Sequence, residues 1–166
     1  MRDVLAPRLK VLFVGINPGL YSAATGHHFA RPGNRFWPAL HLAGFTPHQL
    51  DPSQQRQLLR HGYGISNLVN RATASADELA PEEFVAGRER LAGKVRRYRP
   101  KIVSFLGVGA YCHAFSCKRA RVGPQKEPFE GAAVWLLPNP SGLNANYQLF
   151  ELVKLFRRLR QSGSKG

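Results

Sequence analysis

The sequence predicts an α/β fold in which helices cover both faces of a parallel sheet. Short apolar runs alternate along the chain with longer segments of helical periodicity. Two of the runs are almost continuously apolar, as expected for strands that are covered on both faces. The length of 166 residues fits one domain. We expect that domain to span residues 1–161 and to be followed by a flexible tail at 162–166.

The predicted elements follow one another in an alternating order. The expected strands are Lys10–Gly15 (KVLFVG), Gly64–Val69 (GISNLV), Lys101–Gly107 (KIVSFLG) and Val134–Pro138 (VWLLP). The expected helices are Asn34–Ala43, Pro52–His61, Pro81–Tyr98 and Tyr147–Leu159. Pro81–Tyr98 opens with Pro-Glu-Glu, a frequent helix start, and is predicted to be a long helix.

Two turn-forming segments follow the first and the last predicted strand. Gly15–Gly19 (GINPG) contains Asn17, and Pro138–Asn144 (PNPSGLN) contains Asn139. Ligand sites in parallel sheets lie beyond the carboxyl ends of the strands. We therefore expect both loops to converge on one pocket, although a simple tight turn remains an open interpretation of Asn17.

The charge of the chain indicates a polyanionic partner. Lys and Arg number 24 against 10 Asp and Glu, which gives a formal net charge of +14. Such an excess attracts nucleic acids and, as a second candidate, anionic membrane surfaces. The basic residues are spread along the chain, whereas a membrane-surface helix would concentrate them. No apolar run reaches the roughly 20 residues of a membrane span, and we expect a cytoplasmic protein without a membrane partner.

Aromatic, His and Arg residues are concentrated in Thr25–Trp37 (TGHHFARPGNRFW). Aromatic rings interleaved with cations suit stacking on bases and contacts to phosphates. We assign Phe36 and Trp37 to the core of the following helix, whereas Phe29 lies in a loop where burial is less expected. His27 and His28 lack a second pair of ligands, and the only cysteines are Cys112 and Cys117. We expect no metal and no cofactor.

Together, these segments resemble the mismatch-specific uracil and thymine DNA glycosylases, the Mug/TDG branch of the uracil-DNA glycosylase superfamily. Val11–Phe45 is similar to the first signature of that branch, and Leu137–Leu143 (LPNPSGL) is similar to the second. Gly64–Thr73 (GISNLVNRAT) resembles an intervening block more loosely. The resemblance covers nearly the whole chain. It implies a three-layer α/β/α sandwich around a short, mainly parallel central sheet.

The resemblance also implies a reaction and a set of residues that perform it. A target nucleotide is flipped out of the duplex, and its glycosidic bond is then hydrolysed to leave an abasic site. Phe29 is expected to stack on the flipped pyrimidine, and Asn17 is expected to orient the attacking water. A carboxamide cannot take up a proton at neutral pH, so a slow enzyme is expected. The remaining substrate-binding positions are Ile16, Gly19, Ser22 and Asn139.

A second set of residues is expected to contact DNA. Gly142, Leu143 and Asn144 are similar to the wedge that enters the duplex in this branch, with Leu143 as the apolar plug. Asn67 and Arg71 in the intervening block complete the set.

The chain departs from the pattern of the branch at several positions. Asn70 is assigned as a catalytic position, although an acidic residue is common there in the branch. The absence of that carboxylate is expected to lower activity. Asn67 stands where a Lys can occur, and Ala145 replaces an Arg that can help to recognise the opposite guanine. Ser22 lies beside the C5 edge of the pyrimidine, next to a bulky Tyr21. We expect uracil to be accepted more readily than thymine.

The predicted partner is double-stranded DNA with uracil mismatches, bound by a monomer. The absence of Lys from both signatures argues against a Schiff base and thus against lyase chemistry. Three alternatives remain open: a DNA-binding module without catalysis, a hydrolase of free nucleosides, and a protein that binds membrane surfaces. The nucleoside hydrolase would need no basic surface, and the binding module would bind DNA without releasing a base.

Overall fold

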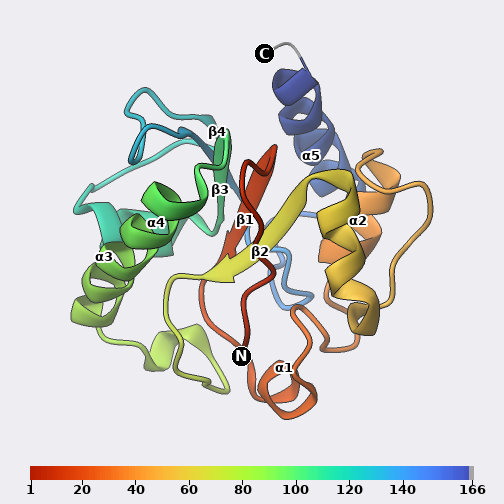
Figure 1. Cartoon of the computed structure of the whole chain (residues 1–166). Coiled ribbons are helices and arrows are strands. Elements are labelled where there is room, and N and C mark those ends of the chain that lie inside the picture. The colour runs from red at the N-terminus through yellow and green to blue at the C-terminus, as the bar shows by residue number, and fades with distance from the viewer. Residues whose placement is uncertain (165–166) are drawn as a thin grey trace.

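The computed structural model describes residues 1–164 as an α/β/α sandwich around a sheet of five strands, in agreement with the predicted fold (Figure 1). The strand order is β2 (Tyr63–Asn67), β1 (Val11–Gly15), β3 (Ile102–Leu106), β5 (Ala133–Leu137) and β4 (Gly123–Pro124). The pairs β1–β2, β1–β3 and β3–β5 are parallel, and the short β4 is antiparallel to β5.

Each face of the sheet has its own layer of helices, because successive side chains of a strand point to opposite faces. Val11 and Phe13 pack with α2 (Phe36–Leu42) and α5 (Leu149–Ser164). Leu12 and Val14 pack in a second apolar cluster with α3 (Pro81–Tyr98) and α4 (Val108–Phe115). Figure 1 shows these two layers on either side of the sheet. Phe36 and Trp37 are buried in the first cluster, as expected.

Several elements differ from the sequence-based expectation. The predicted helix Pro52–His61 is a 3-10 helix, η1, which is capped by Asp51. The short helices α1 (Leu20–Thr25), η2 (Ala76–Glu78) and α4 were not predicted. Helix α5 extends to Ser164 and thus covers part of the expected tail, while residues 165–166 lie outside the described residues.

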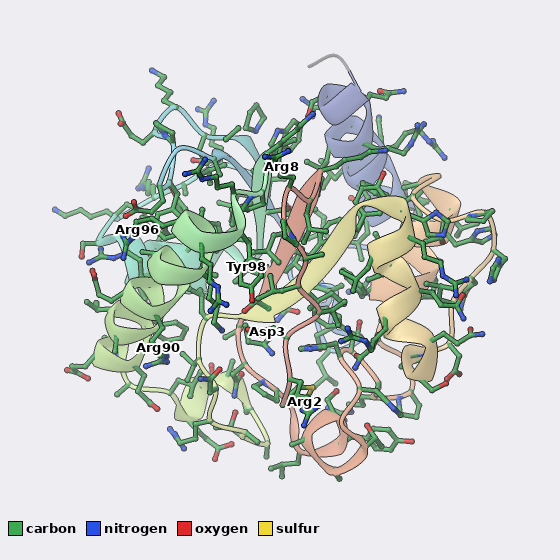
Figure 2. All side chains as sticks on the ribbon, viewed as in Figure 1. Arg2, Asp3, Arg8, Arg90, Arg96 and Tyr98 are labelled. Carbon is green, nitrogen blue, oxygen red and sulfur yellow. The ribbon has the colours of Figure 1, made fainter. Side chains whose placement is uncertain are left out.

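The N-terminal segment runs along the outer edge of the sheet. Val4 forms an antiparallel bridge with Ile65 of β2, through hydrogen bonds of 2.8 and 2.9 Å. Arg2 and Arg8 of this segment lie at opposite ends of the sheet (Figure 2). The segment therefore pairs with the edge strand β2 and links the two ends of the sheet.

One glycine allows α3 to lie against the loop that follows β2. A Cβ built on Gly87 would be only 2.0 Å from the carbonyl oxygen of Leu68. No side chain fits at that distance, so only glycine permits this approach of helix and loop. The position of α3 consequently sets the position of the loop that starts at Leu68.

Candidate active site

A pocket of about 340 Å³ opens at the carboxyl ends of β1, β2 and β3, within the range typical of small-molecule sites. The loops after β1 and β2 run side by side there, because Leu68 and Val69 donate backbone hydrogen bonds to Gly15 and Ile16 at 2.9 Å each. The predicted site residues that line the pocket are Ile16, Asn17, Gly19, Ser22, Phe29, Asn67, Asn139, Leu143 and Asn144. Asn17, in the loop after β1, and Asn139, in the loop after β5, thus line one pocket, as expected from the sequence.

Asn17 is held by hydrogen bonds that fix the orientation of its carboxamide. Its Nδ2 donates to the backbone carbonyl of Arg71 at 2.8 Å and to the Oγ1 of Thr73 at 2.8 Å. A carbonyl oxygen can only accept, so the nitrogen of Asn17 must face Arg71. Among the described residues, none donates a hydrogen bond to the Oδ1 of Asn17. This oxygen can therefore accept a hydrogen bond from water.

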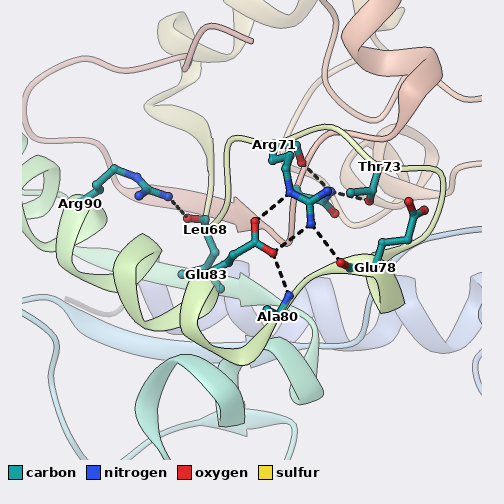
Figure 3. A network of polar contacts seen from close by, with 8 residues as sticks. Leu68, Arg71, Thr73, Glu78, Ala80, Glu83 and Arg90 are labelled. Atoms are coloured by element: carbon teal, nitrogen blue, oxygen red, sulfur yellow. Dashed lines mark hydrogen bonds and ion pairs between the residues drawn. The ribbon is translucent and has the colours of Figure 1, made fainter.

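The segment that supports Asn17 is tied to the start of α3 by an ion pair (Figure 3). The Nε of Arg71 lies 2.9 Å from the Oε1 of Glu83, and its Nη2 donates to the carbonyl of Glu78 at 3.0 Å. Hydrogen bonds from Arg71 and from the backbone N–H of Ala80 lower the pKa of Glu83 to about 2. The side chain of Arg71 is thus engaged within the protein while its carbonyl orients Asn17.

The loop that carries Phe29 is fixed through its backbone. The N–H of His28 donates to the Oε1 of Gln55 at 2.7 Å, and the Nε2 of Gln55 donates to the carbonyl of Gly26 at 3.2 Å. The indole N–H of Trp37 donates to the carbonyl of His28 at 3.0 Å. Phe29 itself has a φ of 53°, a left-handed conformation that is costly for an aromatic residue. The surrounding bonds hold it there.

Phe29 and Asn67 meet at Gly15 on the floor of the pocket. A Cβ built on Gly15 would lie 3.2 Å from the Cζ of Phe29 and 2.7 Å from the Oδ1 of Asn67. The ring of Phe29 is half-buried and stacks on Phe36 with a centroid distance of 4.2 Å, so it packs more closely on the core than we expected. Asn67 is 9% exposed, and its carboxamide has no hydrogen-bond partner among the described residues. The floor thus combines an aromatic ring with an unpaired amide.

The loop with Leu143 is organised around Arg35. The guanidinium group of Arg35 donates to the carbonyls of Ser141 at 2.6 Å and of Asn144 at 3.2 Å, and it also contacts the carbonyls of Pro140 and Tyr147. The side chain of Leu143 is 73% exposed at the tip of this loop. Arg35 therefore holds the loop in place, and the side chain of Leu143 projects from it.

Three predicted residues lie outside the lining of the pocket. Asn70 and Gly142 are exposed, and Arg71 contributes its carbonyl to Asn17 but does not line the cavity. Ser22 is buried, and its Oγ accepts the N–H of Ala30 at 3.1 Å.

Other residues that position the site were missed by the sequence analysis: Arg35, Gln55, Thr73 and Glu83. The sequence contains no motif that predicts these contacts, because each residue bonds to a segment that is distant along the chain.

Two features are absent from the described residues, a metal-binding cluster and a membrane-spanning helix. Within residues 1–164, no group of three or more His, Cys, Asp or Glu side chains could hold a metal ion.

No helix in the same range is long and apolar enough to cross a bilayer. Helix α5 packs its apolar stripe of Leu152, Phe156 and Leu159 into the core.

Comparison with known proteins places this architecture in one family. The fold is similar to that of a candidate uracil DNA glycosylase from Methanosarcina acetivorans, solved by solution NMR, with a TM-score of 0.63. The two sequences are 19% identical, and the match covers 96% of each chain. The model of the uracil DNA glycosylase superfamily matches residues 2–160, nearly the entire sequence. The chain belongs to the uracil DNA glycosylase superfamily.

Proposed function

We propose that this protein removes uracil from mismatched double-stranded DNA, hydrolysing the glycosidic bond of the flipped nucleotide and leaving an abasic site. Membership of the superfamily supports uracil excision in general. The observation that carries the proposal is the convergence of Phe29, Asn67 and Asn17 on one pocket at the end of the sheet. The ring of Phe29 and the unpaired amide of Asn67 can bind a flipped base. The Oδ1 of Asn17 can accept a hydrogen bond from the water that hydrolysis requires.

Recognition of the base is assigned to the floor of the pocket. The ring of Phe29 offers a face on which the flipped pyrimidine can stack, which contributes about 1–3 kcal/mol. The amide of Asn67 can accept a hydrogen bond from N3–H of uracil while donating one to O4. Because Asn67 is almost fully buried, an unmatched base would leave this amide unpaired at a cost of about 1–3 kcal/mol. Asn67 then contributes to base recognition, in addition to the DNA contact that we predicted.

Hydrolysis is assigned to a water molecule held by Asn17. The water oxygen attacks C1′ of the sugar, the bond from C1′ to N1 breaks with its electron pair staying on uracil, which leaves as an anion, and the proton lost by the water passes to solvent. The Oδ1 of Asn17 orients the water by accepting one of its hydrogens, but it cannot remove a proton. Stabilisation of the uracil anion must then supply most of the rate enhancement. The backbone N–H groups near Ile16 and Phe29 are the proposed donors.

Entry of the nucleotide is assigned to the loop held by Arg35. Leu143, exposed at its tip, would occupy the space that the flipped base leaves in the duplex. A mismatched base is more easily unstacked, so this wedge favours mismatches. No lysine is among the described residues that line the pocket, which supports hydrolysis without lyase activity.

Selection against thymine is assigned to the side of the pocket near Ser22. The buried hydroxyl of Ser22 is held by the N–H of Ala30, whereas Tyr21 is 50% exposed and does not line the pocket. We propose that the methyl group of thymine meets this fixed wall, so that uracil is released faster.

The test is single-turnover base release from labelled DNA with U·G, U·A or T·G pairs, and from single-stranded DNA with uracil. We expect the fastest release from U·G. Asn17→Ala should lower release at least about a hundredfold, in line with losses on removal of a group that acts in the transition state. Asn67→Ala should lower it about tenfold. Gln57→Ala, which removes a half-buried amide outside the pocket, serves as the matched control.

A second comparison isolates the wedge. Leu143→Ala should slow release from U·A duplexes more than from single-stranded DNA, since only a duplex has a stack to be filled. Equal losses on both substrates would contradict the assigned role of Leu143.

Two outcomes would replace the proposal. Tight, salt-dependent binding without release from any substrate would leave a non-catalytic DNA-binding module. Hydrolysis of free deoxyuridine that is as fast as release from duplexes would indicate a nucleoside hydrolase.

A further inference from the structure

We propose that the end of the sheet opposite the pocket binds a second segment of double-stranded DNA. The surface consists of Arg8, Lys10, Arg99 and Lys101, which we call the far-end patch. All four side chains are exposed. The inference goes beyond the proposed function and uses it only to choose DNA among the possible polyanions.

Backbone contacts bring the members of the patch together. The N–H of Arg8 donates to the carbonyl of Tyr98 at 2.8 Å, one residue before Arg99. Val11 is paired with Ile102 in the sheet, and the N–H of Ile102 donates to the carbonyl of Lys10 at 3.2 Å. Lys10 and Lys101 therefore precede neighbouring parallel strands, whose axes are about 4.8 Å apart.

The charges of the patch are not neutralised within the protein. None of the four side chains forms an ion pair or a hydrogen bond with another described residue, while other cations, such as Lys94 and Arg96, are paired with Asp3 and Glu130. Clustered like charges repel one another and destabilise the fold unless an anion binds. A bound polyanion with regularly spaced charges would remove that repulsion.

The backbone at two of these residues adds an independent argument. Arg8 has a φ of 60° and Arg99 a φ of 52°, both in the left-handed region. Glycine or asparagine would adopt this conformation at lower cost. An arginine at each of two neighbouring left-handed positions indicates that the side chain is useful there.

The patch cannot serve the duplex whose nucleotide enters the pocket. The pocket is lined by residues at the carboxyl ends of the strands, whereas the patch precedes their first residues. A strand of five residues is about 17 Å long. Double-stranded DNA is stiff over roughly 150 base pairs and would not bend around so small a domain. A second duplex segment is therefore the partner that fits, and one chain would bridge the two segments.

Native mass spectrometry with short, undamaged duplexes tests the inference, because it counts chains and duplexes in one complex and does not depend on base release. We expect one chain to carry two duplexes at low salt. The patch variant combines Arg8→Asn, Lys10→Gln, Arg99→Asn and Lys101→Gln. Asparagine is chosen at the left-handed positions so that the fold is retained while the charge is removed. The matched control removes four exposed charges elsewhere, Lys118→Gln, Arg119→Gln, Arg121→Gln and Lys126→Gln.

The patch variant should bind one duplex only, whereas the control should still bind two. The slope of log K against log salt should become shallower by about 3.6, since four phosphate contacts are lost and each contributes about 0.9 to the slope. Base release by the patch variant from a short U·G duplex should be unchanged.

Three results would overturn the inference: a wild-type chain that never carries two duplexes, a patch variant that still carries two, or a control variant that alone loses the second. Vesicles of phosphatidylserine and phosphatidylcholine provide a further arm. Binding of these vesicles through the patch, without a complex of two duplexes, would assign the surface to membranes instead. If the chain binds two duplexes at once but releases no base, the result contradicts the proposed function and leaves the inference about the far-end patch intact.

Discussion

The carboxamide of Gln55 accepts the backbone N–H of His28 at 2.7 Å, immediately before Phe29 in the chain. Gln55 is buried and also donates to the carbonyl of Gly26, so it spans the loop that holds the stacking ring. Gln55→Ala should lower the free energy of unfolding by about 1–3 kcal/mol, because it leaves the buried N–H of His28 without its acceptor. We expect base release to fall about tenfold as the ring loses its fixed position.

Binding to a duplex with an abasic site separates this positioning role from a general loss of fold. That ligand has no base to stack on Phe29, so its affinity should be unchanged in the folded Gln55→Ala variant. Gln57→Ala on the same 3-10 helix is the control for both measurements. Equal losses of base release and abasic-site binding would refute the positioning role.

Glu83→Gln tests the ion pair that supports Asn17. The pKa of Glu83 is lowered from 4.5 to about 2, so its stabilising contribution is present above pH 4.5 and is lost as the pH falls towards 2. Urea unfolding should therefore show a less stable variant at pH 7 and no difference from the wild type near pH 2. Base release at pH 7 should also fall, because Arg71 is less firmly held.

The control for this prediction is Glu89→Gln on the same helix. Glu89 pairs with Arg88 at 2.9 Å, but its side chain is 69% exposed and does not contact the loop of Asn17. Its replacement should change neither base release nor the pH dependence. A stability difference for Glu83→Gln that persists unchanged down to pH 2 would contradict the interpretation.

Gly15→Ala tests the floor of the pocket. The added methyl group would lie 2.7 Å from the Oδ1 of Asn67 and 3.2 Å from the ring of Phe29, so both groups must shift. We expect single-turnover base release to fall about tenfold or more, with a loss of stability of about 1–3 kcal/mol from overpacking. Gly93→Ala on α3, where the nearest atom is 4.0 Å away, should have no such effect on release. Full activity of Gly15→Ala would exclude a tightly fitted floor.

Asn70→Ala tests the catalytic role that the resemblance implies for this position. Asn70 is exposed and does not line the pocket, so we expect base release within about twofold of the wild type. A tenfold loss, or a clear gain with Asn70→Asp, would instead support a direct role in activating water. Both variants are measured on the same U·G duplex.

The central strands could be predicted because burial on both faces leaves a plain sequence signal. The expected strand Lys10–Gly15 and the observed Val11–Gly15 differ by one residue, and the other parallel strands agree to within two. Helix α4, Val108–Phe115, continues an apolar run that begins in β3, so no change of periodicity marks its start. Helix α1 has only six residues, too few for a helical period to be recognised.

The candidate site could be predicted only as far as its loops. Asn17 and Asn139 follow strands whose ends converge, which is a property of the fold class. The contacts of Gln55 with His28 and of Glu83 with Arg71 join segments without a shared motif. The unpaired amide of Asn67 at Gly15 depends on the close approach of β1 and β2, and spacing along the chain does not encode that approach.

The glycine at position 87 has a consequence for the evolution of this site. It lets α3 rest against the carbonyl of Leu68, at the start of the loop that supplies Arg71 and Thr73 to Asn17. Any larger residue at position 87 would displace α3 or the loop and thereby tilt the carboxamide of Asn17. Random mutagenesis with selection for uracil repair should therefore recover almost no replacement of Gly87, although this position contributes no atom to the chemistry.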